Sequence, residues 1–408
     1  MKGKAVIWVL LCVFLIVSVN GSVIAIEDET GVKDKDEQTV EKENVPIVEN
    51  IPFEIKAKSA LLMCANTGEI IFEMNSDERR PIASITKIMT MLLVMEAIAQ
   101  NKISLDDVVV ASEHAAGMGG SQVYLAVGEE FTVHDLLKAV AIHSANDASV
   151  ALAEHVAGSE GVFVTMMNEK ARELGMANTN FLDCSGLTDE GHYSTARDIA
   201  IMARELITKY PLIIEYTTIK HDTFRNGTFD LDNTNHLIGK YRGMTGLKTG
   251  VTNAAGYCLT ATASRDGLDL ISVILGAESM SLRFSETTKM LDYGFSNYEI
   301  MKIERKGETA GKVMVRKGLG LSVPVAYEDN KSVLLKRGQR DKVQQEVRLP
   351  EYVNAPVSTG DRAGEVVLTL ENKEILSIPL IVTEDVQKAS WFKLFLRLTV
   401  HWFSLARR

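Results

Sequence analysis

The sequence has few cysteines and lacks the motifs of a metallopeptidase. Four cysteines in 408 residues are too few for a disulfide framework. The eight histidines include no H-E-x-x-H pair, and their scatter gives no zinc-ligand spacing. We therefore expect no metal ion and no other cofactor. We also expect the cysteines outside the N-terminal segment to be buried free thiols, namely Cys64, Cys184 and Cys258.

The chain also lacks an excess of positive charge. Its 44 Lys and Arg residues are outnumbered by 54 Asp and Glu residues, which gives a formal net charge of −10. Nucleic-acid-binding domains are usually strongly basic, so we expect no nucleic-acid partner. The length is sufficient for two domains of ordinary size.

The apolar run at the N-terminus is too short to cross a bilayer. Ala5–Val17 follows Lys2 and Lys4 and precedes small residues, whereas a membrane span takes roughly 20 apolar residues. This pattern predicts a cleaved signal peptide over residues 1–25, and hence export. Residues 26–50 are acidic and poor in apolar residues, so we expect a disordered leader there.

The C-terminus has the opposite charge. Residues 386–408 contain no acid and are rich in Trp and Phe. Polar residues recur there every three or four positions, as one stripe along a helix: Lys393, Arg397, His401, Ser404 and Arg408. A basic amphipathic helix of this composition is typical of a segment that lies in the membrane interface. The alternative is a helix packed on the protein's own core.

The middle of the chain divides into two parts. Residues 51–300 alternate helical and strand-like patterns, which predicts a mixed α+β domain. Residues 301–385 contain short alternating runs separated by Gly, Asn and Asp. Such runs predict a small antiparallel sandwich or barrel, and this part holds no cluster of catalytic residue types.

A first chemical motif is Ser84-Ile85-Thr86-Lys87, at the start of an apolar helical pattern. A separation of three residues on a helix places the Ser84 hydroxyl and the Lys87 amine on one face. A serine is a poor nucleophile at neutral pH, but an adjacent lysine with a lowered pKa can activate it. A backbone N–H at a helix N-terminus can also bind an oxyanion.

Two further groups complete the pattern. In Ser144-Ala145-Asn146-Asp147, Ser144 is placed to relay a proton and Asn146 to hold a substrate amide. In Lys248-Thr249-Gly250, we expect the lysine to lower the pKa of Lys87 by repulsion. Gly250 would let substrate approach an edge strand closely. Serine peptidases that bind penicillin combine these three groups in this order.

The chain resembles the serine-type D-Ala-D-Ala carboxypeptidases of peptidase family S11, which are low-molecular-mass penicillin-binding proteins. The resemblance extends to MNEKARELGMANTNFLDCSGL, HYSTARDIA and NTNHLIGKYRGMTGLKTGVTNAAGYCLTATA. It implies a β-lactamase/transpeptidase-like catalytic domain, followed by a small β domain and a membrane-anchoring helix. It also implies D-Ala-D-Ala stem peptides of peptidoglycan as substrates, β-lactams as inhibitors, and a location on the outer face of the cell membrane.

The resemblance also implies residue roles. Ser84 would be the acylated nucleophile and Lys87 its general base, with Ser144 relaying a proton. Backbone N–H groups of Ser84 and Val251 would form the oxyanion hole. Substrate binding would involve a further set along the same cleft: Asn146, Lys248, Thr249, Gly250, Val251 and Arg283.

Two positions depart from the family pattern, and alternatives remain. Thr245 replaces a usual acidic residue, and Val251 stands where His or Tyr is common, so substrate preference and rate are open.

A D,D-endopeptidase acting on cross-links would use the same groups. A β-lactamase would need a deacylating Glu in an E-x-x-L-N segment, which is not evident. A non-catalytic wall-binding protein would not need the intact motifs.

Overall fold

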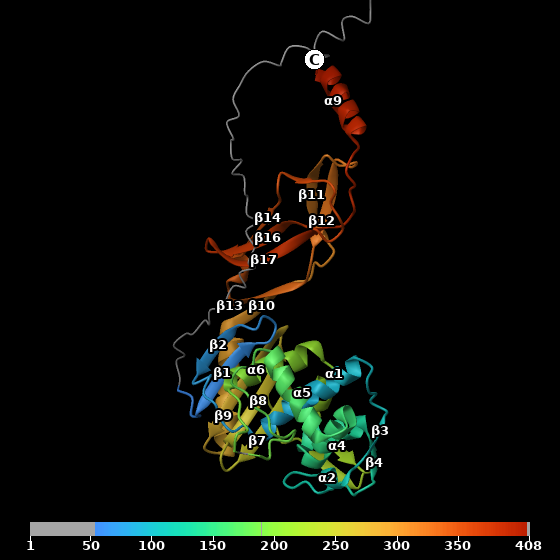
Figure 1. Cartoon of the computed structure of the whole chain (residues 1–408). Helices are drawn as coiled ribbons and strands as arrows, with labels where there is room; N and C mark the ends of the chain where they lie inside the picture. The colour runs from blue at the N-terminus through green and yellow to red at the C-terminus, as the bar shows by residue number, and fades with distance from the viewer. Residues whose placement is uncertain (1–53, 189, 406–408) are drawn as a thin grey trace, which may run out of the picture. The chain divides into compact units, whose positions relative to one another are not determined.

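The computed structural model describes residues 54–188 and 190–405 (Figure 1). The predicted signal peptide and acidic leader lie outside these residues. A five-stranded antiparallel sheet forms the centre of the first domain, with the strand order β2-β1-β9-β8-β7. The strands are β1 (Ser59–Cys64), β2 (Ile70–Met74), β7 (Met244–Thr252), β8 (Gly256–Arg265) and β9 (Leu268–Ala277). The sequence prediction of a mixed α+β fold is confirmed.

The sheet separates two hydrophobic cores. Leu61 and Met63 of β1 point into one core, and Leu62 and Cys64 into the other, because successive strand residues face opposite sides. The helix α8 (Met280–Asn297) covers the second core. The first core is covered by several helices: α1 (Lys87–Ala99), α4 (Asn146–Ala157), α5 (Glu160–Glu173) and α6 (Ala196–Lys209).

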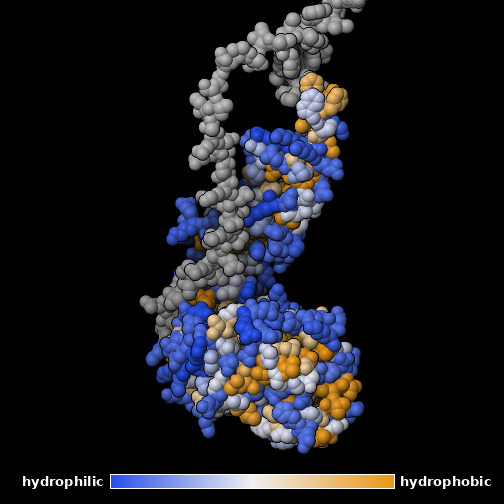
Figure 2. Space-filling model, in the orientation of Figure 1, coloured by the Kyte–Doolittle hydropathy of each residue, from blue (hydrophilic) through white to orange (hydrophobic). Residues whose placement is uncertain are grey.

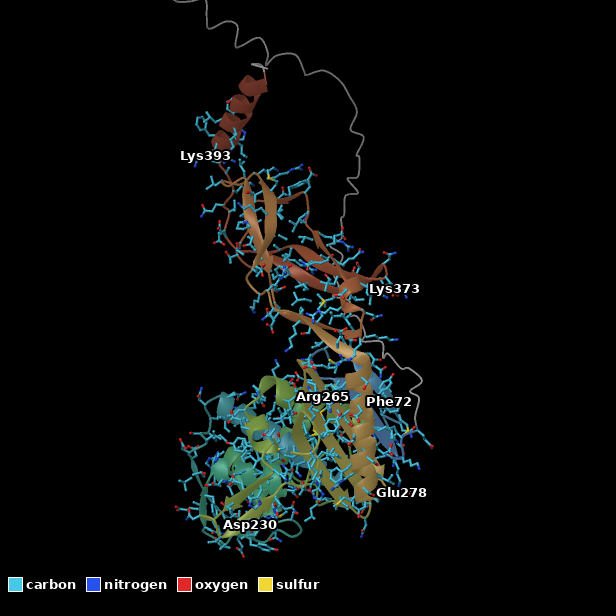
Figure 3. All side chains as sticks on the ribbon, turned by 180° about the vertical axis from the view of Figure 1, so that it is seen from behind. Phe72, Asp230, Arg265, Glu278, Lys373 and Lys393 are labelled. Carbon is cyan, nitrogen blue, oxygen red and sulfur yellow. The ribbon has the colours of Figure 1, made fainter. Side chains whose placement is uncertain are left out.

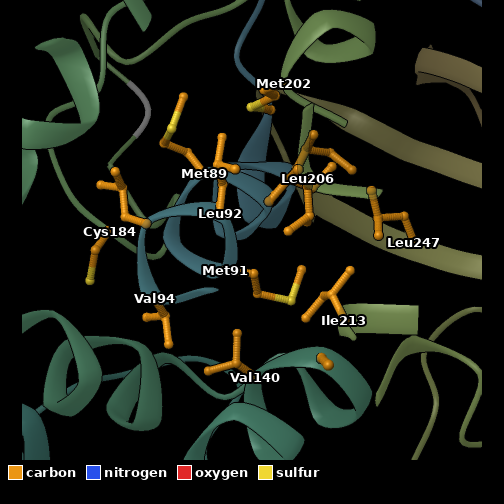
Figure 4. Packing of buried hydrophobic residues seen from close by; sticks show 14 of the residues in the cluster. Met89, Met91, Leu92, Val94, Val140, Cys184, Met202, Leu206, Ile213 and Leu247 are labelled. Atoms are coloured by element: carbon orange, nitrogen blue, oxygen red, sulfur yellow. The ribbon is translucent and has the colours of Figure 1, made fainter. Parts of the chain in front are cut away.

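The helix α1 is buried on almost every side. Its residues from Lys87 to Met95 are all buried, which explains why its apolar pattern shows no polar face. Figure 4 shows Met89, Met91 and Leu92 of this helix among side chains of other elements. Because the neighbours on all sides are packed, α1 is a rigid base for the residues that precede it.

Smaller elements complete the first domain. Hydroxyl caps begin several helices: the Thr132 side chain accepts from Asp135 N, and Thr195 accepts from Asp198 N. The remaining elements are β3 (Val108–Val110), α2 (Glu113–Ala116), β4 (Glu130–Thr132), α3 (Val133–Lys138), α7 (Ile213–Thr217), β5 (His221–Phe224) and β6 (Phe229–Asp232).

The second domain is built from short strands, as predicted, around a core of its own. Its six-stranded sheet has the order β14-β16-β17-β12-β11-β15, and β10 pairs with β13. The strands are β10 (Tyr298–Ile303), β11 (Thr309–Arg316), β12 (Ser322–Tyr327), β13 (Lys331–Lys336), β14 (Gln344–Arg348), β15 (Tyr352–Asn354), β16 (Arg362–Leu370) and β17 (Lys373–Val382).

This domain differs from the sequence expectation in two details. The pair β11–β15 is parallel, whereas we expected only antiparallel pairs. The alternating pattern of residues 364–376 is typical of one continuous strand, but the strand breaks at Glu371-Asn372, where both residues have positive φ angles. Asn tolerates this conformation better than most residues, so a hairpin turn forms there.

The last helix is α9 (Trp391–Leu405), within the segment predicted to be amphipathic. Its first turns expose Trp391, Phe392 and Lys393. Figure 3 shows Lys393 on this helix and Lys373 at the start of β17.

Candidate active site

The predicted pair of Ser84 and Lys87 is in contact. Ser84 lies in a 3-10 turn, Ala83–Thr86, and α1 begins only at Lys87. We expected the apolar helix to begin at Ser84 or just before it, so the α-helix starts later than predicted. The Lys87 Nζ atom nevertheless donates to Ser84 Oγ at 3.0 Å, because a 3-10 turn also places residues three apart on one side.

The Lys87 amine is completely buried. Its Nζ atom also donates to Asn146 Oδ1 at 2.6 Å and to the Ser185 carbonyl oxygen at 2.7 Å. Burial lowers the pKa of Lys87 to about 8, although the nearby carboxylate of Asp183 opposes the shift. An amine with this pKa is partly neutral near pH 7, as a general base must be.

The second predicted lysine is buried as well. The Lys248 Nζ atom donates to the carbonyl oxygen of Thr249 at 3.1 Å. Burial, followed by repulsion from Lys87 and Arg283, lowers the pKa of Lys248 well below its usual range. We expected repulsion from Lys248 to lower the pKa of Lys87. In the structure, burial lowers the pKa of Lys87, and repulsion from Lys87 contributes to the lowered pKa of Lys248.

The second motif lies opposite Ser84. Ser144 adopts a left-handed backbone conformation with a φ angle of 65°, which separates the π-helical turn Ala139–His143 from α4. Asn146 begins α4, and its Nδ2 atom donates to the Gly119 carbonyl oxygen at 2.6 Å. The Asn146 amide is thus engaged at both ends within the protein, and substrate binding by Asn146 stays a prediction.

The third motif lies on β7, which is an edge strand of the sheet. The Thr249 hydroxyl donates to the Thr234 hydroxyl at 2.8 Å. A Cβ atom on Gly250 would lie 2.8 Å from the Ile82 carbonyl oxygen and 3.1 Å from the Ser84 amide nitrogen. The close neighbour of Gly250 is therefore the turn that bears Ser84, whereas we expected the substrate there.

Arg283 reaches the same strand from α8. Its Nη1 atom donates to the Gly250 carbonyl oxygen at 3.4 Å, and the buried Nε atom has no hydrogen-bond partner. The guanidinium lies over the rings of Tyr257 and Phe284. These rings hold the cation beside β7 without neutralising it.

A cavity of about 290 Å³ joins the three motifs. It is lined by Ser84, Ser144, Asn146, Thr249 and Gly250 of these motifs, and by the predicted residues Val251 and Arg283. The amines of Lys87 and Lys248 are buried behind this surface. The site thus has a hydroxyl with an adjacent buried amine, and the Arg283 guanidinium among its lining residues.

Several relatives match this chain. A family model described as D-alanyl-D-alanine carboxypeptidase matches residues 43–279, and one described as penicillin-binding protein 5, C-terminal domain, matches residues 298–388. The D-alanyl-D-alanine carboxypeptidase DacF of Bacillus subtilis is 44% identical over 351 residues, which are 85% of this chain and 90% of that protein. The chain belongs to the D-alanyl-D-alanine carboxypeptidase family. The resemblance stated from the motifs is confirmed.

Solved structures of penicillin-binding proteins are similar to this chain in sequence and in fold. Penicillin-binding protein 5 from Haemophilus influenzae is 35% identical, with a TM-score of 0.76 over 83% of this chain and 99% of that one. Penicillin-binding protein D2 from Listeria monocytogenes, in its ampicillin-bound form, is also 35% identical. Its TM-score is 0.55, over 60% of this chain and 98% of that one.

The two departures from the family pattern are accommodated locally. The Thr245 hydroxyl donates to the Thr262 hydroxyl at 2.8 Å, and its carbonyl oxygen accepts from Thr217 Oγ1 at 2.6 Å. Val251 is 55% exposed at the rim of the cavity. Neither residue therefore leaves a buried polar group without a partner.

The sequence interpretation missed a loop that supports Ser84. The Asp183 carboxylate accepts hydrogen bonds from the backbone of Ser185, Gly186 and Thr188. Gly186 has a φ angle of 79°, and a Cβ atom there would collide with the Ala83 carbonyl oxygen. The segment Asp-Cys-Ser-Gly had a turn-like composition that could have signalled this loop.

His192 supports the same turn from the other side. The Thr86 hydroxyl donates to the Ala83 carbonyl oxygen and is 2.8 Å from His192 Nε2. His192 is thus a structural hydrogen-bonding residue. His236 instead lines the cavity and stacks on Phe284.

The remaining predictions concern cysteines and metal ions. Cys64, Cys184 and Cys258 are buried free thiols, as predicted. Across residues 54–188 and 190–405, no three His, Cys, Asp or Glu side chains gather into a possible metal site.

Proposed function

We propose that this protein removes the terminal D-alanine from peptidoglycan stem peptides by acyl transfer through Ser84. The observation that carries the proposal is the 3.0 Å contact between the Lys87 amine and the Ser84 hydroxyl in the cavity. A neutral lysine in this position can take the hydroxyl proton as the oxygen attacks a carbonyl carbon. The family membership supplies the substrate class.

The first step forms an ester. Ser84 Oγ attacks the carbonyl carbon of the penultimate D-alanine, and Lys87 Nζ takes the proton. Backbone N–H groups of Ser84 and Val251 are the proposed oxyanion donors. The close approach of Gly250 to the Ser84 amide supports this assignment, because it brings the strand and the turn side by side.

The second step releases the products. The carbon–nitrogen bond breaks, and the leaving D-alanine takes the proton held by Lys87, relayed by Ser144. Water then attacks the ester carbonyl carbon while Lys87 accepts its proton; the bond from this carbon to Ser84 Oγ breaks, and Lys87 returns the proton to Ser84 Oγ. Lys248, Thr249 and Arg283 would bind the terminal carboxylate, since cationic groups and hydroxyls favour that anion.

We further propose that β-lactams acylate Ser84. The relative from Listeria monocytogenes is described in an ampicillin-bound form, and the cavity here is lined by residues of the three motifs, Ser84 among them. Mass spectrometry of the protein after incubation with penicillin should show one covalent adduct. An adduct that persists in a Ser84→Ala variant would contradict the assignment.

The name of the matching family favours carboxypeptidase over endopeptidase activity. The test is to incubate the enzyme with a pentapeptide ending in D-Ala-D-Ala and, separately, with a cross-linked peptide dimer. We expect D-alanine release from the pentapeptide to be the faster reaction. Faster cleavage of the dimer would establish the endopeptidase instead.

The division into domains and the cellular location of the protein are proposals that rest on the sequence. We divide the chain into a signal peptide (1–25), a leader (26–50), a catalytic domain (51–300), a β domain (301–385) and an anchoring helix (386–408). The two matching family models support the division near residue 300. The strand β10 crosses that boundary: Ile300 packs in the catalytic core and Ile303 in the β core.

We propose that α9 holds the exported enzyme on the outer face of the cell membrane. Trp391 and Phe392 are 77% and 65% exposed, which is unusual for aromatic side chains of a helix packed on its own domain. Among the described helices, none combines the length and apolarity needed to cross a bilayer. Deletion of residues 386–408 should leave an active enzyme that no longer sediments with vesicles.

A further inference from the structure

The turn between β11 and β12 carries exposed apolar side chains. Leu319 and Leu321 lie in this turn and are 40% and 63% exposed. Met314, near the end of β11, is 56% exposed. Large aliphatic side chains in a short exposed turn are costly in water, and a cluster of them points to a contact surface.

This turn is bound to the chain segment that leads into α9. Leu319 N donates to the Gln387 carbonyl oxygen at 2.8 Å, and Ala389 N donates to the Lys317 carbonyl oxygen at 2.7 Å. Arg397 of α9 then donates to the carbonyl oxygens of Gly318 and Leu319. The turn and the first half of α9 are therefore neighbours.

The turn Lys317–Leu321 and the helix α9 both expose apolar side chains. Figure 2 shows hydrophobic surface on α9, where Phe395 and Leu396 are 50% and 54% exposed. Lys317 of the turn and Lys388 of the connecting segment are exposed as well. No acidic residue follows Asp385 in the chain. Apolar and aromatic side chains beside lysines are the composition of a surface that binds anionic lipid.

We propose that the turn Lys317–Leu321 is a second membrane-binding element, which inserts Leu319 and Leu321 into the lipid interface beside α9. This inference rests on the proposed membrane location of the enzyme and extends it to the β domain. The occupant is an anionic lipid surface, since the exposed lysines match its charge. Two joined contacts also fix the orientation of the β domain on the membrane more closely than a single helix would.

The test measures vesicle binding by residues 26–408. The vesicles contain phosphatidylcholine with one quarter phosphatidylglycerol, and the variant is Leu319→Ser/Leu321→Ser. We expect its partition coefficient to fall by about tenfold, since two apolar side chains are lost from the interface. The matched control is Val347→Ser on β14, where Val347 is 42% exposed in the same domain. Its binding should not change.

A second measurement does not depend on weakened binding. Among the described residues the cysteines are buried, so a single Leu321→Cys variant can be labelled with an environment-sensitive NBD fluorophore. The NBD emission should rise and shift to shorter wavelength when vesicles are added. The same label at Val347→Cys should keep its aqueous spectrum. An aqueous spectrum at residue 321 on bound protein would overturn the inference.

The outcomes separate this inference from the proposed anchor. If deletion of 386–408 abolishes binding while Leu319→Ser/Leu321→Ser binds like the unchanged protein, the anchor stands and the turn is excluded. If the deletion leaves binding intact, the anchor itself is wrong. If Leu319→Ser/Leu321→Ser alters only self-association, measured by sedimentation velocity without lipid, the turn contacts a second copy and the lipid assignment is overturned.

Discussion

The Nζ atom of Lys87 lies 2.6 Å from Oδ1 of Asn146, although 59 residues separate them in sequence. This hydrogen bond joins the start of α1 to the start of α4 and fixes the amine beside Ser84. An amine that donates to neutral acceptors inside the protein can lose a proton more easily than one paired with a carboxylate. The contact therefore holds the amine beside Ser84 at a place where burial lowers the pKa of Lys87 to about 8.

The rate of acylation should depend on the neutral fraction of Lys87. Its pKa of about 8 predicts that kcat/KM falls about tenfold per pH unit below pH 8 and levels off above it. The direction follows from the role of the amine, which must be unprotonated to accept the Ser84 proton. Stopped-flow acylation by a fluorescent penicillin from pH 5.5 to 9.5 measures this profile. A rate that is flat from pH 6 to 9 would contradict the assignment of Lys87 as base.

Asn146→Asp should move this profile to higher pH. A carboxylate in place of the amide oxygen stabilises the protonated amine, so the pKa of Lys87 rises and less of it is neutral. We expect a shift of about one to two pH units and a rate at pH 7 that is lower by about ten- to a hundredfold. Asn146→Ala is the comparison, because it removes the same contacts without adding charge. An equal profile in both variants would show that charge at this position does not act on Lys87.

The sequence predicted the short motifs of this site but not the contacts between distant segments that hold them together. The spacing of Ser84 and Lys87 predicted their contact, since three residues form one helical turn. The bond to Asn146 depends on how α1 packs on α4, and no local pattern encodes that. The contact of the Asp183 loop with the Ala83 carbonyl oxygen was missed for the same reason, since Gly186 and Ala83 are about 100 residues apart. Likewise, strand patterns predicted the short-strand domain but not the parallel pairing of β15.

Gly186→Ala should damage the site through the turn that bears Ser84. A Cβ atom at Gly186 would collide with the Ala83 carbonyl oxygen, so either the turn or the loop must move. We expect a loss of about 3 kcal/mol or more in unfolding free energy, and acylation slowed by more than about tenfold. Gly158→Ala is the matched control, because Gly158 also has a φ angle of 79° but has open space around it.

The control isolates the collision from backbone strain. Gly158→Ala should cost only about 1 kcal/mol, which is the penalty of a left-handed conformation for a residue with a side chain. Urea denaturation and the acylation rate are measured for both variants. If the two glycine variants lose equal stability and acylate equally fast, contact with Ala83 is unimportant.

Asp183→Asn should weaken the same loop in a pH-dependent way. Although burial opposes ionisation, hydrogen bonds from Thr188 and the nearby backbone hold the pKa of Asp183 at about 2. A depressed carboxyl pKa contributes stability above the unfolded value near 4 and loses it as pH falls through 2. The variant should therefore be less stable by about 2 kcal/mol at pH 7, and the difference should shrink between pH 4 and 2. Denaturation curves at several pH values measure this, with exposed Asp106→Asn as a control that should change little. A stability loss that is the same at pH 7 and pH 2.5 would mean that the Asp183 charge is not what holds the loop.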